Sequence, residues 1–160
     1  MAFVNVYLGL GSNQGDREGN LREAVSCLDK AFGTPHAALS HILETASWGF
    51  QGNPFLNACV LYRLPRRGSA ATQAESILRV CKEIERSLGR KEEALFAEDG
   101  TRIYRDRPID IDLLFYGTEH LETEDLTVPH PLIGERDFVK IPLREIAKPS
   151  LRRAFPELFD

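Results

Sequence analysis

Long apolar runs are absent from this 160-residue sequence, and no stretch approaches the roughly 20 apolar residues of a membrane-spanning helix. The first residues, MAFVNVYLGLGS, also lack the basic start and the cleavage site of a secretory signal peptide. We therefore expect a cytoplasmic protein that has no membrane as a partner.

Cysteine is scarce, and positive charge is in deficit. Cys27, Cys59 and Cys81 are odd in number and show no CxxC or Cys/His metal spacing, which favours reduced, structural thiols over disulfides or a zinc site. The formal net charge of −4 argues against the basic surface of a general nucleic-acid binder, although a local basic cluster can still bind a small anion. We expect no nucleic-acid partner.

What is present is an ordinary globular composition, with 42% hydrophobic and 28% charged residues. A chain of 160 residues suits one compact domain with a sizeable core. No internal repeat, low-complexity segment or linker interrupts it. These features predict a single domain over residues 1–160.

Hydrophobic periodicity predicts the main elements. Residues 4–10 alternate like a half-buried strand, and residues 21–32 repeat at helical spacing until Gly33 ends the helix. A capping-box pattern at 72–75 begins a second amphipathic helix that Gly89 closes. Further strand-like runs and a short C-terminal helix follow from the remaining pattern, at 38–47, 55–64, 109–116 and Pro142–Ala147. The order strand, helix, strand, strand, helix, strand predicts a ferredoxin-like α+β sandwich, with helices on one face of a largely antiparallel sheet.

The last predicted strand carries two aspartates inside an apolar run, IDIDLLFY. Side chains two residues apart in a strand share a face, so Asp110 and Asp112 point the same way with Cα atoms roughly 7 Å apart. Leu114 and Tyr116 are expected to continue that face, which disfavours a plainly solvated surface. A pair of partly buried carboxylates needs a partner.

The favoured partner is a magnesium ion. Carboxylate ligands without nearby cysteine, in a chain with few histidines, fit Mg²⁺ better than zinc. Mg²⁺ that is held by one or two protein carboxylates usually has nucleotide phosphates among its other ligands. Asp110 and Asp112 are therefore predicted metal ligands at a nucleoside-triphosphate site.

The segment between the second helix and this strand is rich in arginine, with Arg90, Arg102, Arg105 and Arg107. A mobile connection of this kind can close planar donors over the negative charge that develops in phosphoryl transfer. An ordinary solvated charge run explains the segment equally well, because acidic residues offset the arginines, namely Glu92, Glu93, Glu98, Asp99 and Asp106. Both interpretations stay open for the segment taken alone.

Several blocks along nearly the whole chain together resemble one enzyme family. They are LGLGSN (Leu8–Asn13), FLNACV (Phe55–Val60), IERSLGR (Ile84–Arg90), RPIDIDLLFYG (Arg107–Gly117) and TVPHPLIGERDF (Thr127–Phe138). The sequence resembles the 6-hydroxymethyl-7,8-dihydropterin pyrophosphokinases of folate biosynthesis. The resemblance implies transfer of the β,γ-pyrophosphoryl group of ATP to the hydroxymethyl oxygen of a reduced pterin, with release of AMP.

The resemblance also implies which residues handle ATP. Asp110 and Asp112 would hold two Mg²⁺ ions that bridge the triphosphate, and Arg90 and Arg107 would act on phosphates as catalytic residues. Further ATP contacts are implied for Glu85, on the polar side of the second helix, and for Leu113, Thr127, His130 and Arg136.

A pterin is a flat heterocycle, so its site needs aromatic faces and hydrogen bonds at the ring edge. By resemblance, Phe55 and Phe138 sandwich the ring, and Asn57 reads its edge. Phe55 and Asn57 lie two apart on one predicted strand and therefore share a face. The remaining implied pterin contacts are backbone groups at Thr45, Ala46 and Trp48, together with Gly11 and Asp110.

The chain departs from the family pattern in places. Many members have a second arginine two positions after the one at Arg90, where this chain has Glu92, so Arg102 or Arg105 is the candidate replacement. Phe55 stands where a Tyr is frequent, and Trp48 where an aliphatic residue is common. These departures concern loop closure and substrate fit rather than the reaction type.

Other functions stay open from the sequence. A magnesium-dependent nucleotidyltransferase also combines a Gly-Ser element with paired aspartates, but there the pair typically follows on the next strand, whereas most of this chain separates Ser12 from Asp110. A non-catalytic ferredoxin-like nucleotide sensor would need no such combination of carboxylates, arginines and an aromatic–amide pocket. ATP and the reduced pterin are the expected small-molecule partners, and partner proteins are unknown.

Overall fold

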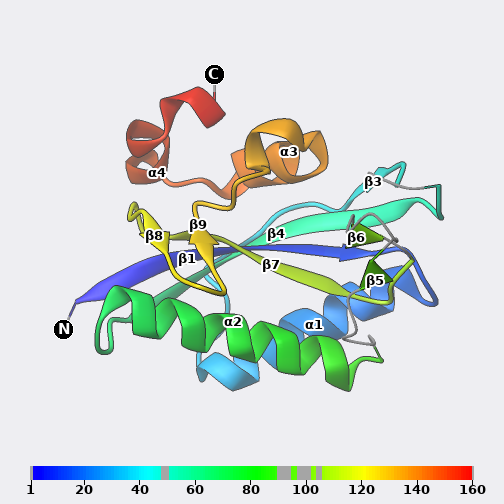
Figure 1. Ribbon diagram of the computed structural model, residues 1–160, viewed down its shortest axis with the longest axis horizontal. Coiled ribbons are helices and arrows are strands. Elements are labelled where there is room, and N and C mark those ends of the chain that lie inside the picture. The colour runs from blue at the N-terminus through cyan, green and yellow to red at the C-terminus, as the bar shows by residue number, and fades with distance from the viewer. Residues whose placement is uncertain (1, 48–50, 90–94, 97–101, 104–105, 160) are drawn as a thin grey trace.

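The protein is seen here as a computed structural model that describes residues 2–47, 51–89, 95–96, 102–103 and 106–159 (Figure 1). Its centre is a five-stranded antiparallel sheet in the order β2-β4-β1-β7, with β3 also paired to β4. The strands are β1 (Phe3–Ser12), β2 (Ala38–Leu39), β3 (Leu43–Thr45), β4 (Phe55–Pro65) and β7 (Asp110–Tyr116). The run predicted as one strand at 38–47 is therefore two short strands on one edge. The predicted ferredoxin-like α+β fold is confirmed.

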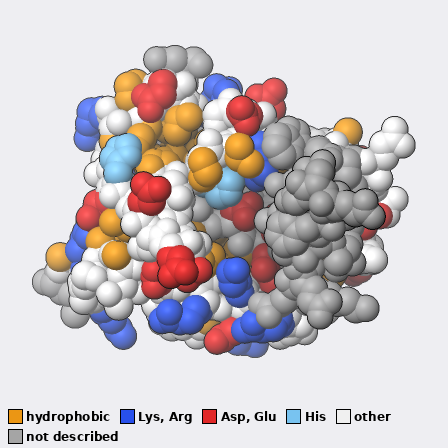
Figure 2. Space-filling model, in the orientation of Figure 1, with side chains coloured by type: hydrophobic (Ala, Val, Ile, Leu, Met, Phe, Trp, Pro, Cys, Tyr) orange, Lys and Arg blue, Asp and Glu red, His pale blue; other side chains and the backbone are white. Residues whose placement is uncertain are grey.

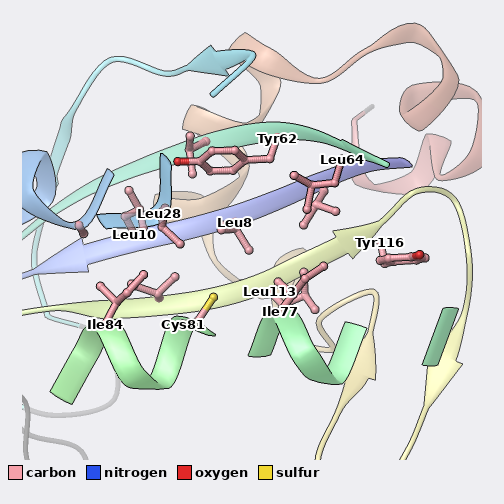
Figure 3. Close-up of a cluster of buried hydrophobic side chains, with 14 of the residues drawn as sticks. Leu8, Leu10, Leu28, Tyr62, Leu64, Ile77, Cys81, Ile84, Leu113 and Tyr116 are labelled. Carbon is pink, nitrogen blue, oxygen red and sulfur yellow. The ribbon is translucent and has the colours of Figure 1, made fainter. Parts of the chain in front are cut away.

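One face of the sheet is covered by α1 (Arg17–Phe32) and α2 (Ala70–Ser87). The alternation in β1 is as predicted, because Val4, Val6, Leu8 and Leu10 all lie in the core on this side. Figure 3 shows side chains from the sheet and from both helices meeting in this core, among them Leu8, Leu28, Tyr62, Ile77 and Cys81. Burial of this apolar surface is the main stabilising contribution to the two layers.

The opposite face is covered by the C-terminal elements, α3 (Asp137–Ile146) and α4 (Pro149–Ala154), with the short 3₁₀ helices η1 (Ile133–Glu135) and η2 (Pro156–Leu158) (Figure 1). Helices therefore lie on both faces rather than on one. The predicted short helix at Pro142–Ala147 begins earlier, at Asp137, and Pro142 lies inside it. Burial of Val139, Leu143 and Ile146 stabilises the helix across the proline, although Pro142 donates no backbone hydrogen bond.

The helix ends follow from local capping. The Asp16 carboxylate accepts a hydrogen bond from the Gly19 N–H at the start of α1, and Gly33 ends the helix in the left-handed region, with φ of 68°. α2 begins earlier than predicted, because Ser69 caps it and accepts from the Thr72 N–H at 3.1 Å. The prediction that Thr72 begins the capping box was therefore wrong by one helical turn.

The register between β1 and β7 shifts near the middle of β7. Leu8 lies opposite Leu113, whereas Tyr7 lies opposite Phe115, so Leu114 is an additional residue in β7. An additional residue in one strand reverses the inside–outside alternation beyond it.

This bulge changes which side chains share a face with the aspartates. Leu114 and Phe115 both pack in the core beneath α3 and α4. Tyr116 packs on the other side, with α1 and α2 (Figure 3). The prediction that Leu114 continues the face of Asp110 and Asp112 fits the structure, but the same prediction for Tyr116 was wrong.

Small hairpins complete the fold outside the main sheet. β5 (Leu95–Phe96) pairs with β6 (Arg102–Ile103), within the segment predicted as an irregular connection, and β8 (Leu121–Glu122) pairs with β9 (Thr127–Val128). Among the helices of the described ranges, none has both the length and the apolar character needed to cross a membrane.

Candidate active site

A pocket lies on the α3 side of the sheet, at one sheet end. Because adjacent strands are antiparallel, the last residues of β1 and β3 meet the first residues of β4 and β7 there. Most of the predicted pterin, metal and catalytic residues line this pocket together. The lining residues are Gly9, Leu10, Gly11, Thr45, Ala46, Phe55, Asn57, Ala58, Cys59, Arg107, Asp110, Asp112, Arg136, Phe138 and Val139.

Two glycines of β1 separate the two sides of the pocket. Gly11 lies opposite Asn57 in β4 and opposite Asp110 in β7. Gly9 lies opposite Asp112 in the same ladder. A Cβ atom added to Gly11 would lie 3.4 Å from Cδ1 of Phe55, so this position lies directly beneath the aromatic ring. The glycines leave the pocket floor without side chains, which gives a flat ligand access to the sheet.

The β4 side of the pocket is aromatic and amide-bearing. Asn57 is only 4% exposed, and its Nδ2 donates to the Leu43 carbonyl at 3.2 Å and to Oγ1 of Thr45 at 2.9 Å. These bonds fix the amide so that Oδ1 lies toward Gly11, 3.6 Å from an ideal Cβ at that position. An oriented amide beside an aromatic ring suits recognition of a planar ring with hydrogen-bonding edges.

The β7 side of the pocket combines carboxylates with arginines. Nη1 of Arg107 lies 3.5 Å from Oδ1 of Asp110, and Nη1 of Arg136 lies 3.8 Å from Oδ2 of Asp112. Both distances exceed the 2.7–2.9 Å that is typical of a charge-assisted hydrogen bond. The Arg136 guanidinium also lies 5.5 Å from the centre of the Phe138 ring. Elsewhere on the surface, acidic and basic side chains are interspersed on the face that Figure 2 shows.

The donor set fits a magnesium ion better than a structural metal. In the described parts of the chain, no group of three or more His, Cys, Asp or Glu side chains is arranged to hold a metal. Asp110 and Asp112 are 26% and 31% exposed, lie two residues apart on one strand face and line the pocket. A hard cation that takes one or two protein carboxylates and completes its shell with phosphate and water matches this arrangement.

Glu85 was predicted to lie on the polar side of α2, and this prediction was wrong. The residue is 8% exposed and faces β7. Its Oε2 accepts a hydrogen bond of 2.7 Å from the N–H of Ile111, the residue between the two aspartates. The predicted contact of Glu85 with ATP stays a prediction.

His130 lies close to the carboxylate side of the pocket. Burial lowers the pKa of its imidazole, and the positive charge of Arg136 lowers that pKa further, while Asp110 acts in the opposite direction. Nδ1 accepts the Leu132 N–H at 3.2 Å, so the neutral ring carries its proton on Nε2. The backbone N–H of His130 donates to the Leu114 carbonyl, which joins this segment to β7.

The structure does not bring every predicted ATP residue to the pocket. Leu113 is 2% exposed and belongs to the core under α1 and α2, so a contact with ATP would have to use its backbone. Thr127 is exposed and paired with Glu122 in the β8–β9 hairpin. The positions of Trp48, Arg90 and Arg105 lie outside the described residues, and Arg102 is described only as backbone in β6.

Sequence reasoning missed residues that the pocket contains. Gly9 repeats the spacing of Gly11 on the same strand face, and that period of two was a usable signal. Cys59 lies two residues beyond Asn57 on β4, and burial raises the pKa of its thiol to about 12, helped by the Glu145 and Asp112 carboxylates. Val139 follows Phe138 on α3, and nothing in the sequence alone placed it here.

Comparison with known proteins identifies the family. The family model of 7,8-dihydro-6-hydroxymethylpterin-pyrophosphokinase (HPPK) matches residues 7–148. This chain belongs to the HPPK family. The 2-amino-4-hydroxy-6-hydroxymethyldihydropteridine pyrophosphokinase of Porphyromonas gingivalis (strain ATCC 33277) is 39% identical over 144 residues, covering 89% of this chain and 90% of that protein.

Two further proteins are similar to this chain. The folate synthesis bifunctional protein of Arabidopsis thaliana is 36% identical over 145 residues, covering 90% of this chain and 27% of that protein. A solved structure described as "Crystal Structure Analysis of the HPPK-DHPS in complex with substrates" matches with a TM-score of 0.66 at 12% identity, covering 99% of this chain and 43% of that one. At that identity the structural likeness supports the fold alone.

Proposed function

We propose that this member of the HPPK family is an ATP-dependent pyrophosphokinase of folate biosynthesis. It transfers the β,γ-pyrophosphoryl group of ATP to the hydroxymethyl oxygen of 6-hydroxymethyl-7,8-dihydropterin. In this step the hydroxyl oxygen attacks the β-phosphorus and loses its proton. The bond between the β-phosphorus and the oxygen that links it to the α-phosphorus breaks, and AMP leaves.

The observation that carries the proposal is the juxtaposition of two chemistries in one pocket. Phe55 and Asn57 lie on the β4 side, and Asp110 and Asp112 lie on the β7 side, with the glycines of β1 between them. A planar acceptor on the first side would have its hydroxymethyl group directed to the second, where a triphosphate would be held. Holding both substrates in a reactive geometry is itself a large part of catalysis.

On the pterin side, Phe55 and Phe138 stack on the ring, and Asn57 bonds its edge. Gly11, Thr45 and Ala46 line the same space, and backbone groups of the last two are proposed to bond the ring edge. Trp48 is proposed to complete the edge contacts on the strength of the sequence alone. The fixed Asn57 amide favours a ring that offers a donor to Oδ1.

On the phosphate side, Asp110 and Asp112 would hold two magnesium ions, whose charge would neutralise the triphosphate during the transfer. Arg107 and Arg136, whose guanidinium groups lie beside the two aspartates, bind phosphate oxygens. His130 donates from Nε2 to phosphate or ribose.

Several assignments rest on the family pattern. Arg90 contacts phosphate, with Arg102 or Arg105 in the place of the arginine absent at Glu92. Backbone groups near Leu113 and Thr127 face the nucleoside, and the family pattern assigns Glu85 to the same region. The known bifunctional relatives suggest that a product of this enzyme passes to another folate enzyme, with or without physical association.

Product identification tests the reaction. The purified protein is mixed with ATP, Mg²⁺ and 6-hydroxymethyl-7,8-dihydropterin, and nucleotide and pterin products are separated by chromatography, with a control that lacks pterin. Pterin-dependent AMP and a pterin that has gained two phosphates are expected. ADP, or pyrophosphate with an adenylylated pterin, would show attack at a different phosphorus and would refute the proposal. Tight ATP binding without turnover would favour a sensor.

A further inference from the structure

A hydrogen-bonded cluster joins three chain segments just outside the pocket. It consists of Asn13, Asn53 and Asp106, and we call it the Asn13–Asn53–Asp106 cluster. Asn13 follows β1, Asn53 precedes β4, and Asp106 precedes β7, so the cluster lies beside three of the four strands that form the pocket. None of its members is among the residues that line the pocket.

Asn13 is 1% exposed and holds both backbone groups of Arg107. The Arg107 N–H donates to Oδ1 of Asn13 at 2.7 Å, and the Asn13 N–H donates to the Arg107 carbonyl at 3.1 Å. Pro108 restricts Arg107 to an extended conformation, which favours both of these hydrogen bonds to Asn13. Asn13 thus holds, through its side chain and its backbone, the residue whose side chain reaches Asp110.

Asp106 holds the other two members of the cluster with its carboxylate. Oδ1 accepts from Nδ2 of Asn13 at 2.7 Å and from the N–H of Asn53 at 3.1 Å, and Oδ2 accepts from Nδ2 of Asn53 at 3.1 Å. Nδ2 of Asn53 also donates to the Asn13 carbonyl at 3.3 Å, and Nδ2 of Asn13 donates to the Asn53 carbonyl at 3.0 Å. All three groups that contact Asp106 are N–H donors, so both oxygens of residue 106 have to act as acceptors.

An amide at position 106 cannot replace this carboxylate. Its NH₂ group would face Nδ2 of Asn53, donor against donor, and the bond would be lost. If the Asn53 amide turned over to accept, its donation to the Asn13 carbonyl would be lost instead. Either arrangement breaks at least one bond of the cluster.

We propose that Asp106 is a positioning residue that orients Arg107 through Asn13 and couples it, through Asn53, to the segment that leads into β4. The effect on catalysis rests on the proposed function, whereas the effect on the position of Arg107 does not. Because Asp106 lies next to Arg107 but outside the pocket, it acts on the reaction only through its neighbours.

Hydrogen exchange tests the positioning without any reaction. Asp106→Asn should speed exchange of the Arg107 amide about tenfold, because loss of the bond between Asn53 and residue 106 loosens the cluster that holds the Asn13 side chain, which accepts from that amide. Asp125→Asn, which removes the same charge at an exposed site, should leave that amide unchanged. An unchanged Arg107 exchange rate in Asp106→Asn overturns the proposal.

Kinetics test the consequence. Asp106→Asn should lower kcat by about tenfold to a hundredfold and leave KM for the pterin near the wild-type value, since a small displacement of Arg107 affects the transition state most. A raised KM with unchanged kcat overturns the proposal. Asn53→Ala serves as the second variant. The fold decrease in kcat of the double variant should be smaller than the product of the fold decreases of the two single variants. If the two fold decreases in kcat simply multiply, the coupling between Asp106 and Asn53 is refuted.

The two readouts separate the two proposals. A wild-type protein without pyrophosphoryl transfer refutes the proposed function, and the exchange result then decides the role of Asp106 by itself. Comparison of melting temperatures verifies that each variant is folded before either measurement.

Discussion

Asp112 illustrates how a single residue depends on its neighbours for its chemistry. It lies opposite Gly9, two residues from Asp110, and 3.8 Å from the Arg136 guanidinium. Two carboxylates this close repel each other, so a carboxylate pair is useful when a cation lies between them and a phosphate.

Replacing Asp112 by Asn should therefore nearly abolish turnover. Loss of one metal ligand removes several kcal/mol of transition-state stabilisation, which corresponds to about a thousandfold in kcat. The measurement is the rate of pterin-dependent AMP formation at saturating Mg²⁺, with Asp125→Asn as the matched control. A loss of only a few-fold would contradict the metal assignment.

The cysteines provide a residue-scale prediction of a different kind. Burial raises the pKa of Cys59 to about 12, and burial together with the Glu85 carboxylate raises that of Cys81. Cys27 is half-buried, and its pKa is raised by its partial burial and by Glu23. At pH 8 the Cys59 thiol is therefore protonated.

A disulfide reagent at pH 8 should consequently modify Cys27 alone in the native protein, and slowly. All three thiols should react in denaturant, where burial no longer suppresses the thiolate. Reagent uptake followed by absorbance, with peptide mapping of the modified site, checks this. Rapid native modification of Cys59 would mean that the pocket wall on β4 opens.

At the scale of elements, the contact between α2 and β7 is the one that supports the aspartate strand from behind. Glu85 lies on the buried face of α2 and accepts the N–H of Ile111 at 2.7 Å. A buried N–H that loses its acceptor costs about 1–3 kcal/mol.

Glu85→Ala should lower the free energy of unfolding by about 1–3 kcal/mol, because the Ile111 N–H loses this partner. Glu85→Gln retains an acceptor oxygen and should restore most of that loss. Urea titration measures both, and Glu83→Ala, at an exposed position on the same helix, is the control. Equal destabilisation by Ala and Gln would show that the charge, rather than the hydrogen bond, is what matters.

Elements also show where local sequence signals compete with packing. Ser69 and Thr72 both suit a helix cap, and the chain uses the earlier one, so α2 gains a turn. Pro142 reads as a helix start, yet burial of Val139 and Leu143 extends α3 before it. In both cases the longer helix buries more apolar surface.

At the scale of the whole molecule, the pocket is built from segments that are distant in sequence. The ends of β1 and β3, the starts of β4 and β7, and the first turn of α3 all contribute to it. A ligand that contacts all of them stabilises the folded state by mass action, since the unfolded chain has no such site.

Mg²⁺ and ATP together should therefore raise the melting temperature. At a hundred times the dissociation constant the stabilisation is about 2.7 kcal/mol, or roughly 5–10 °C for a protein of this size. ATP with a chelator should give a much smaller shift, because the aspartates repel an uncompensated triphosphate. Differential scanning fluorimetry measures both melting temperatures. Equal shifts in melting temperature with and without Mg²⁺ would contradict a metal-bridged site.

The order of the main elements, the alternation in β1 and the shared face of Asp110 and Asp112 were predictable from the sequence. These features depend on the periods of strands and helices, which each segment carries locally. The blocks around Phe55, Asn57 and Arg107 likewise pointed to the family that the comparisons confirm.

Other features depend on tertiary contacts and were not predictable. The bulge at Leu114 sends Tyr116 to the other face, Glu85 is buried behind β7, and the C-terminal helices cover the second face of the sheet. The bonds among Asn13, Asn53 and Asp106 also became visible only here. The reason is physical: each feature depends on contacts between residues far apart in the chain, and no local period or propensity encodes which distant partner a side chain will meet.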